Sequence, residues 1–219
     1  VKASNPKVAI SNNGGYLYPD TVEETLRNGQ ADLIGMARTW ISNPNYGELV
    51  QSGRTDDIVP CLKCNKCHKS SMADPWITTC SVNPTYGMNY LLDKMVSPSE
   101  GGKKVAVIGG GPGGMEAAAT AAEQGHEVTL WERTDSLGGL LKFTDYDTLK
   151  SDLKRLKDYL IHRVELSRVR VEYGMTATRE KISEFAPEVL LIAVGSSPVV
   201  FPLPGIELAQ HATAAYTDL

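Results

Sequence analysis

The sequence has 219 residues, of which 42% are hydrophobic and 22% are charged, a composition typical of one or two globular domains. The formal net charge of -4 gives no sign of a nucleic-acid partner, and no apolar run is long enough to cross a membrane. The first residues show neither an initiator methionine nor the layout of a signal peptide, so we expect a cytoplasmic protein and interpret the chain as a middle piece of a longer one.

Residues 1–58 contain two successive strand–helix units. We expect strands at 7–11 and 31–38, a helix at 21–29, and a loop followed by a helix within 41–53. This pattern fits the last two units of a (β/α)8 barrel, whose loops often build a phosphate site.

The loops after these two strands carry candidate phosphate ligands. Gly14 and Gly15 follow the first strand, and Arg38 follows the second. An arginine can hold a phosphate through two hydrogen bonds, although an ordinary surface ion pair explains Arg38 equally well at this stage.

The segment 59–100 is marked by its cysteines, which follow the spacing C-x2-C-x2-C-x12-C as Cys61, Cys64, Cys67 and Cys80. A disulfide framework fits poorly, because four cysteines are few for a chain of this length without signs of secretion. Four thiolates suit either zinc or an iron–sulfur cluster. Structural zinc usually takes two matched C-x2-C pairs, so the three-plus-one arrangement favours a [4Fe–4S] cluster over zinc.

Residues 101–219 open with a dinucleotide-binding fingerprint. A short apolar strand at 105–108 precedes Gly109, Gly111 and Gly114, which occupy the G-x-G-x-x-G positions at the start of an alanine-rich helix. The first glycine permits a tight turn, the second lets a pyrophosphate approach the backbone, and the third lets the helix pack on the strand. The N-terminus of the helix complements the phosphate charge.

Glu132 lies at the end of the next expected strand, 128–131, and 18 residues after Gly114. Its carboxylate can accept hydrogen bonds from ribose hydroxyls and would repel a 2′-phosphate, so we expect FAD, NAD or ADP rather than NADP. A glycine-rich turn without a ligand is the alternative interpretation.

The remaining segments continue an α/β fold with a doubly wound parallel sheet. We expect strands at 168–174 and 188–198, with helices at 149–163 and 178–186. The last strand leads into Gly195, where a ligand can again approach the backbone closely. An apolar stripe on the first of these helices predicts core contacts. Its members are Leu149, Leu153, Leu156 and Leu160.

In this order, the three parts resemble the multi-domain flavin oxidoreductases related to old yellow enzyme. That group includes 2,4-dienoyl-CoA reductase, enoate reductases, NADH:flavin oxidoreductases and trimethylamine dehydrogenase. The matching stretches are ADLIGMARTWISNP (31–44), GRTDDIVPCLKCNKCH (53–68), TCSVNP (79–84), KVAVIGGGPGGMEAA (104–118) and ERTDSLGG (132–139).

The resemblance implies a set of cofactors for these residues. The four cysteines would ligate a [4Fe–4S] cluster, and Arg38 with the Gly14–Gly15 loop would hold the phosphate of FMN. Electrons would pass from NAD(P)H through FAD and the cluster to FMN, which would reduce an activated alkene or an acyl-CoA substrate. Catalytic proton donors have no counterpart here. The residues implied for the ADP part of FAD are Gly109, Gly111, Gly114, Glu132, Gly139 and Gly195.

Alternatives stay open within this resemblance. The cysteine spacing is similar to trimethylamine dehydrogenase, in which electrons leave an amine and the second domain holds only ADP. The stretches CSVNP and CNKCH are similar to the reductases, which we favour. Leu140 and Val194 depart from the reductase pattern and favour ADP over complete FAD. A non-catalytic piece that binds only nucleotide and metal is a further alternative, and a homo-oligomer is neither indicated nor excluded.

Overall fold

The computed structural model describes residues 4–5, 7–68, 78–88, 90–91, 94, 99–197 and 199–210. The chain divides into two compact units, Val1–Ser97 and Pro98–Leu219, which are considered separately below. The last residues of the expected dinucleotide domain, 211–219, lie outside the described part. Among the described residues, no helix is both long and apolar enough to span a bilayer.

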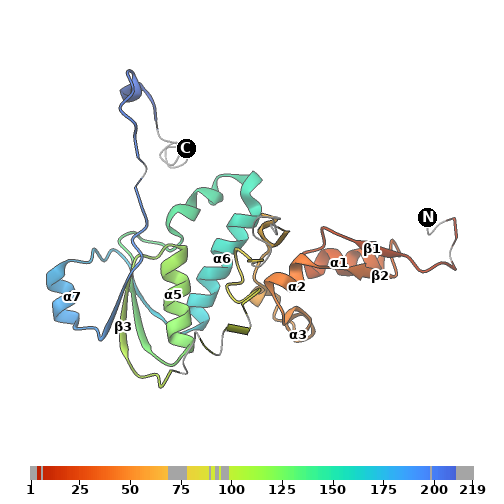
Figure 1. The fold of residues 1–219 in the computed structure, drawn as a ribbon, viewed down its shortest axis with the longest axis horizontal. Coiled ribbons are helices and arrows are strands. Elements are labelled where there is room, and N and C mark those ends of the chain that lie inside the picture. Colours follow the sequence, from red (N-terminus) through yellow and green to blue (C-terminus); the bar gives the residue numbers. More distant parts are fainter. Residues whose placement is uncertain are drawn as a thin grey trace. The chain divides into compact units, whose positions relative to one another are not determined.

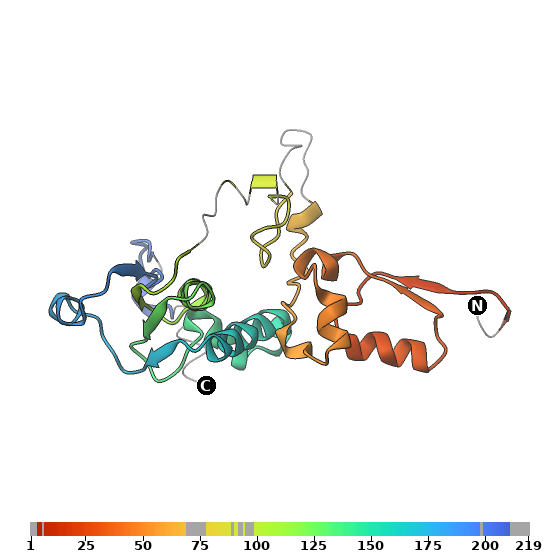
Figure 2. The same ribbon diagram turned by 90° about the horizontal axis from the view of Figure 1, so that it is seen from below.

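The first unit is built on a pair of parallel strands, β1 (Ser11–Asn13) and β2 (Leu33–Gly35). They are connected by α1 (Pro19–Arg27), which lies beside the strands in Figures 1 and 2. The proline at the start of α1 fits the first helical turn, where its missing N–H costs nothing. Two short helices follow, α2 (Arg38–Ser42) and α3 (Tyr46–Gln51).

The strand expected at 7–11 is wrong in its position, because only Ser11 belongs to β1. The Asp32 carboxylate accepts the Ile10 N–H at 2.8 Å, and the Ile10 carbonyl accepts N–H groups from Asp32 and Leu33 at 2.8 and 3.1 Å. These bonds join Ile10 to the start of β2, which offers three residues for pairing. The second strand is also shorter than expected, and Arg38 begins a helix instead of ending a strand.

The second unit contains a four-stranded parallel sheet in the order β5-β4-β3-β6. The chain moves from β3 outward to β4 and β5, and then returns to place β6 on the other side of β3. This is the doubly wound arrangement expected from the sequence. The strands are β3 (Lys104–Ile108), β4 (Glu127–Trp131), β5 (Arg170–Glu172) and β6 (Val189–Ile192).

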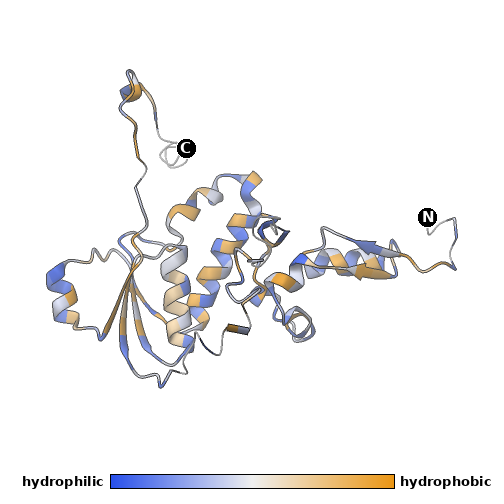
Figure 3. Cartoon of the chain, in the orientation of Figure 1, coloured by the Kyte–Doolittle hydropathy of each residue, from blue (hydrophilic) through white to orange (hydrophobic). Residues whose placement is uncertain are grey.

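Helices α5 (Pro112–Glu123) and α6 (Ser151–Leu166) pack beside each other over this sheet (Figure 1). Figure 3 shows that the strands are predominantly hydrophobic. Val107 and Leu130 are completely buried, and with Met115 of α5 they form the centre of the core. Removing such side chains from water is the main force that holds helices to a sheet.

Arg163 connects the two helices. Its guanidinium lies 2.6 Å from the Glu116 carboxylate and 2.8 Å from that of Glu123, and it donates to the Thr120 hydroxyl at 3.1 Å. The hydrogen bonds from Arg163 lower the pKa of Glu123. A planar guanidinium can bridge three acceptors in this way because its N–H groups diverge.

The leucine stripe expected on the 149–163 helix is partly wrong. Leu149 is 90% exposed, because it lies in the turn before α6 begins at Ser151. Lys157 is buried instead, and its ammonium group donates to the Asp145 carboxylate. A buried lysine is tolerated when a carboxylate compensates its charge, so an ion pair occupies a buried position of α6 that lies outside the expected leucine stripe.

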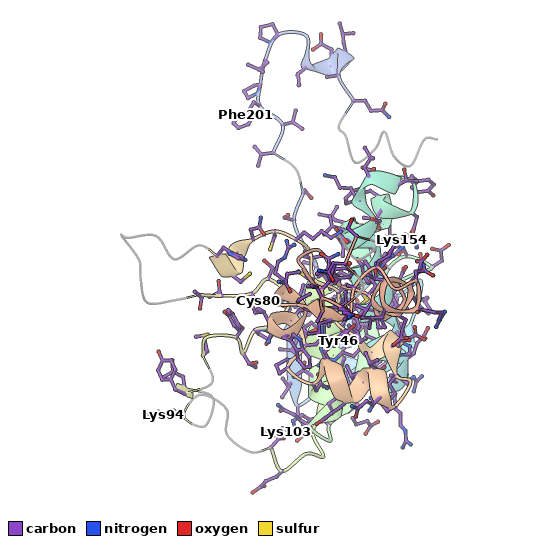
Figure 4. All side chains as sticks on the ribbon, turned by 90° about the vertical axis from the view of Figure 1, so that its right-hand side faces the viewer. Tyr46, Cys80, Lys94, Lys103, Lys154 and Phe201 are labelled. Carbon is purple, nitrogen blue, oxygen red and sulfur yellow. The ribbon has the colours of Figure 1, made fainter. Side chains whose placement is uncertain are left out.

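A shorter helix, α7 (Arg179–Phe185), packs on β4 through aromatic contacts. The Phe185 ring meets Trp131 edge-on at 5.2 Å, and the Lys104 ammonium lies 4.0 Å from the centre of the Phe185 ring. Thr178 caps the helix by accepting the Lys181 N–H at 3.3 Å. After β6 the chain is extended, and Phe201 is exposed on this segment (Figure 4).

Candidate functional site

A cavity of about 770 Å³ lies at the carboxyl ends of the four strands of the second unit. The strand order reverses at β3, and in doubly wound sheets ligands bind at this point of reversal. Segments that follow all four strands line the cavity, together with the turn after Gly138. They are 108–113 from the last residue of β3, 131–134 from the last residue of β4, 175–177 after β5, 193–196 after β6, and 139–142.

A side chain at each of the three fingerprint glycines would meet different surroundings. Gly109 has φ +104°, and a Cβ there would lie 2.4 Å from the Ala193 carbonyl oxygen. A Cβ on Gly114 would lie 1.8 Å from the Gly109 carbonyl oxygen, so this glycine allows α5 to approach β3. Gly111 precedes α5, and the nearest atom to its added Cβ is the Gly139 Cα at 3.9 Å. The backbone at Gly111 is therefore open to the cavity, and no side chain caps α5.

The turn at Gly139 approaches the fingerprint closely. A Cβ on Gly139 would lie 2.8 Å from the Gly111 Cα, and Gly139 also has φ +53°, which favours glycine. Gly195 has φ +75° with open space around it. Both glycines line the cavity, as does Glu132, whereas Gly114 does not line it and is buried in α5.

Glu132 is 7% exposed, and both of its carboxylate oxygens are hydrogen-bonded. Oε2 accepts the Gly110 N–H at 2.7 Å, and Oε1 accepts the N–H and hydroxyl of Thr134 at 2.8 and 2.7 Å. Burial acts to raise the pKa of Glu132, but these hydrogen bonds and the positive charge of Lys142 outweigh burial, so the pKa lies below its ordinary value. Oε2, with one donor, retains a lone pair for a ribose hydroxyl.

The sequence reasoning missed the residues that support this carboxylate. Thr134 donates to it, and Lys142 donates to the Thr134 hydroxyl at 2.7 Å. Thr134 could have been found from its position two residues after an acid, where a hydroxyl commonly bonds locally. Lys142 carries no such local signal.

A second cavity, of about 540 Å³, lies in the first unit beside the glycine loop. Gly14, Gly15 and Arg38 all line it, so the structure brings the three expected phosphate ligands to one place. Both glycines have left-handed backbones, with φ +92° and +80°. Two residues from the cysteine segment, Asn65 and His68, complete the wall.

A third and smaller cavity is lined by all four cysteines. They are free thiols that surround this space. The Ser81 hydroxyl lies 3.3 Å from the Cys64 sulfur and lowers the pKa of that thiol. Burial raises the pKa of Cys61, against the opposing positive charge of Arg38.

The donor set fits a four-thiolate iron–sulfur group, but the cavity is only about 20 Å³, near the space of one water molecule. Among the described residues, which include all four cysteines, no group of three or more His, Cys, Asp or Glu side chains is arranged to hold a single metal ion. Two left-handed residues, Lys63 at φ +53° and Asn65 at φ +55°, turn the loop that carries the first three cysteines. Asparagine tolerates this conformation better than most residues, which explains why it stands at position 65.

Arg38 lines both the glycine-loop cavity and the cysteine cavity. Its Nη1 donates to the Asn65 side-chain oxygen at 3.3 Å. Asn65 was missed in the sequence, because nothing local indicates a contact between residues 27 positions apart. His68, which follows Cys67 directly, lines the glycine-loop cavity instead of the cysteine cavity.

The parallel sheet and the cavity at its strand reversal define a Rossmann-like dinucleotide-binding domain. Residues 103–218 match the model of the pyridine nucleotide-disulphide oxidoreductase family, with a second match over 87–148. Because the match covers more than half of the sequence, the chain belongs to this family.

Individual relatives are flavin oxidoreductases of the expected group. The chain is 32% identical over 201 residues to bilirubin reductase of Mediterraneibacter gnavus, covering 92% of this chain and 31% of that protein. It superposes on 2-naphthoyl-CoA reductase, solved with 2-naphthoyl-CoA, with a TM-score of 0.86, 33% identity and coverage of 94% and 31% of the two chains. Histamine dehydrogenase from Rhizobium sp. 4-9 gives a TM-score of 0.76, 29% identity and coverage of 87% and 29%.

These comparisons confirm the resemblance to flavin oxidoreductases related to old yellow enzyme. The chain spans less than a third of the length of each of the three relatives just described.

Proposed function

We propose that this chain is part of an NAD(P)H-dependent flavin and iron–sulfur oxidoreductase. The observation that carries the proposal is the placement of four free thiols around one cavity, with Arg38 in its wall. The same arginine lines the glycine-loop cavity, so a metal group and a phosphate would lie on either side of one residue.

Each implied group has residues that suit it. Cys61, Cys64, Cys67 and Cys80 would hold a [4Fe–4S] cluster. Gly14, Gly15 and Arg38 would hold the phosphate of FMN. In the second unit, the open backbone at Gly111 and the helix N-terminus suit a pyrophosphate, and Glu132 suits a ribose. When bound, these groups supply hydride and single-electron chemistry between a nicotinamide and the substrate.

The substrate class we propose is an activated alkene or an acyl-CoA thioester. The similarity to bilirubin reductase and 2-naphthoyl-CoA reductase supports a reductase. An amine dehydrogenase is the second candidate, supported by the cysteine spacing and by the similarity to histamine dehydrogenase. Leu140 and Val194 both line the nucleotide cavity, where they could select ADP over FAD.

The first test is the metal content of the protein purified without oxygen. A cluster predicts about four irons and four acid-labile sulfides per chain, with a brown colour that bleaches on reduction. Replacing any one of the four cysteines by serine should reduce the iron content. One zinc ion without sulfide would remove the cluster from the proposal.

The second test distinguishes the reactions. Chromatography of the released nucleotides separates FAD from ADP. NAD(P)H oxidation is measured with an enone as the oxidant, and reduction of an artificial electron acceptor is measured with an amine as the donor. FAD with enone-dependent NAD(P)H oxidation supports the reductase, whereas ADP with amine-dependent reduction of an electron acceptor supports the dehydrogenase. Nucleotide and metal without either activity would support a non-catalytic binding role.

A further inference from the structure

Two residues are shared by neighbouring cavities of the first unit. Among the described residues, Arg38 and Asn65 are the ones that line both the glycine-loop cavity and the cysteine cavity. They lie 27 positions apart in the sequence and are joined by the hydrogen bond from Nη1 of Arg38 to Oδ1 of Asn65, at 3.3 Å. The wall between the two cavities is therefore built around a single cation and its acceptor.

The position of Asn65 connects that wall to the cysteines. It follows Cys64 directly and precedes Cys67 by two residues, in a left-handed backbone conformation with φ +55°. A guanidinium that moves must either break its hydrogen bond to Asn65 or move the loop that carries these thiols.

The electrostatics of the shared cation give it a second role. A phosphate in the glycine-loop cavity and a thiolate-bound cluster in the cysteine cavity are both anionic, and both would be stabilised by the Arg38 charge. The cluster and the phosphate also repel each other, because both are anionic and lie near the same cation. An electron added to the cluster therefore weakens binding of the phosphate.

We propose that Arg38, positioned by Asn65, couples phosphate binding in the glycine-loop cavity to the redox state of the metal group in the cysteine cavity. The coupling rests on the proposed function, which supplies both anions. Its direction is set by charge: FMN phosphate lowers the midpoint potential of the cluster, and by reciprocity the reduced cluster binds the phosphate less tightly. Asn65 acts as a positioning residue, because its side-chain oxygen holds the Arg38 guanidinium in the wall that the two cavities share.

The wild-type protein provides a test that needs no variant. The flavin is removed, and the cluster potential is measured by electron paramagnetic resonance with FMN or with riboflavin, which lacks the phosphate. Coupling predicts that the cluster has a lower potential with FMN than with riboflavin. The expected difference corresponds to FMN binding about fivefold more tightly when the cluster is oxidised than when it is reduced. Equal potentials with the two flavins would overturn the proposal.

Variants then assign the coupling to the two residues. Asn65→Gly removes the acceptor but keeps a residue that tolerates the left-handed backbone. It should reduce the preference for FMN over riboflavin about fivefold and make the difference in cluster potential between the two flavins smaller than in the wild type. Arg38→Gln should reduce the preference about 10- to 100-fold, as expected for loss of a charge-assisted hydrogen bond, and lower the cluster potential with either flavin.

Two control variants match these changes. Lys63→Gly places glycine at the other left-handed position of the loop and should leave the FMN preference unchanged. Arg27→Gln removes an exposed arginine that pairs with Glu23 and should change neither measurement.

The outcomes separate the inference from the proposed function. Wild-type protein that binds neither iron nor FMN overturns the proposed function, and the coupling with it. Wild-type protein that binds both, with Asn65→Gly identical to it in both measurements, leaves the proposed function intact and overturns the role of Asn65.

Discussion

The Glu132 carboxylate is engaged by the protein before any ligand binds. It accepts three hydrogen bonds, from Gly110 and from the backbone and hydroxyl of Thr134. These bonds fix the turn after β4 against the fingerprint loop. The same residue is thus a structural acceptor and a candidate ribose ligand, and the two roles use different lone pairs.

Replacing Glu132 by glutamine should destabilise the second unit by about 1–3 kcal/mol at neutral pH, because an amide NH₂ would face an N–H donor and leave it unpaired. The folded-state pKa of Glu132 is lowered, so its stabilisation is complete above the ordinary value of 4.5 and is lost as pH falls through the lower folded value. The difference in unfolding free energy between wild type and Glu132→Gln should therefore shrink below pH 4.5. Urea denaturation at several pH values measures it.

Glu127→Gln is the matched control for this prediction. Glu127 begins the same strand but is exposed, so its replacement should change the unfolding free energy little at any of these pH values. A difference between wild type and Glu132→Gln that stays constant from neutral to acid pH would show that the ionised form of Glu132 does not stabilise the fold.

At the scale of secondary structure elements, the distance between α5 and β3 is set by one glycine. The added Cβ of Gly114 would lie 1.8 Å from the Gly109 carbonyl oxygen, whereas a Cβ on Gly113 meets nothing within 4 Å. Two neighbouring glycines in the first turn of one helix therefore have opposite tolerance for a side chain. The helix can approach the strand because the residue facing it has no side chain.

Gly114→Ala should destabilise the protein by about 1–3 kcal/mol, since α5 must shift away from β3 to admit the methyl group. Gly113→Ala should be neutral or stabilising by up to about 1 kcal/mol, because alanine restricts the unfolded chain and favours helix. Chemical denaturation of both variants measures the contrast. Equal unfolding free energies for the two would contradict the packing role of Gly114.

At the scale of the whole molecule, each unit contains its own candidate site. All members of the main core cluster, including Val107 and Leu130, belong to the second unit. The four cysteines and Arg38 belong to the first. The core of the Rossmann-like domain and the candidate metal site are therefore built from different sets of residues.

Leu130→Ala should show this separation. Removing a completely buried leucine from the β4 core costs about 2–5 kcal/mol, so the thermal transition of the second unit should move to lower temperature. Iron and sulfide content, which report on the first unit, should remain unchanged below that transition. Calorimetry and metal analysis of the same samples measure both, and parallel loss of iron would contradict independent units.

The sequence by itself determined the first strand–helix–strand unit of the Rossmann-like domain. The order of strand, glycine fingerprint, helix, strand and acid is local, so β3, α5, β4 and the positions of Gly109 and Glu132 follow from neighbouring residues. The burial expected from the helical repeat of residues 149–163 was less accurate, because a contact with a residue outside the helix also decides which side chains are buried. Leu149 of the expected stripe is exposed, whereas Lys157, outside the stripe, is buried because Asp145, brought near by the fold, compensates its charge.

Tertiary structure decided which distant residues meet. The spacing of the cysteines predicts four metal ligands, but only the fold places Arg38 and Asn65 between them and the glycine loop. Likewise, the acid at position 132 is predicted from the fingerprint, but only the fold brings Lys142 to the Thr134 hydroxyl that bonds this carboxylate. The reason is physical: backbone patterns depend on residues a few positions apart, whereas a shared cation depends on chain segments that approach each other only in the folded protein.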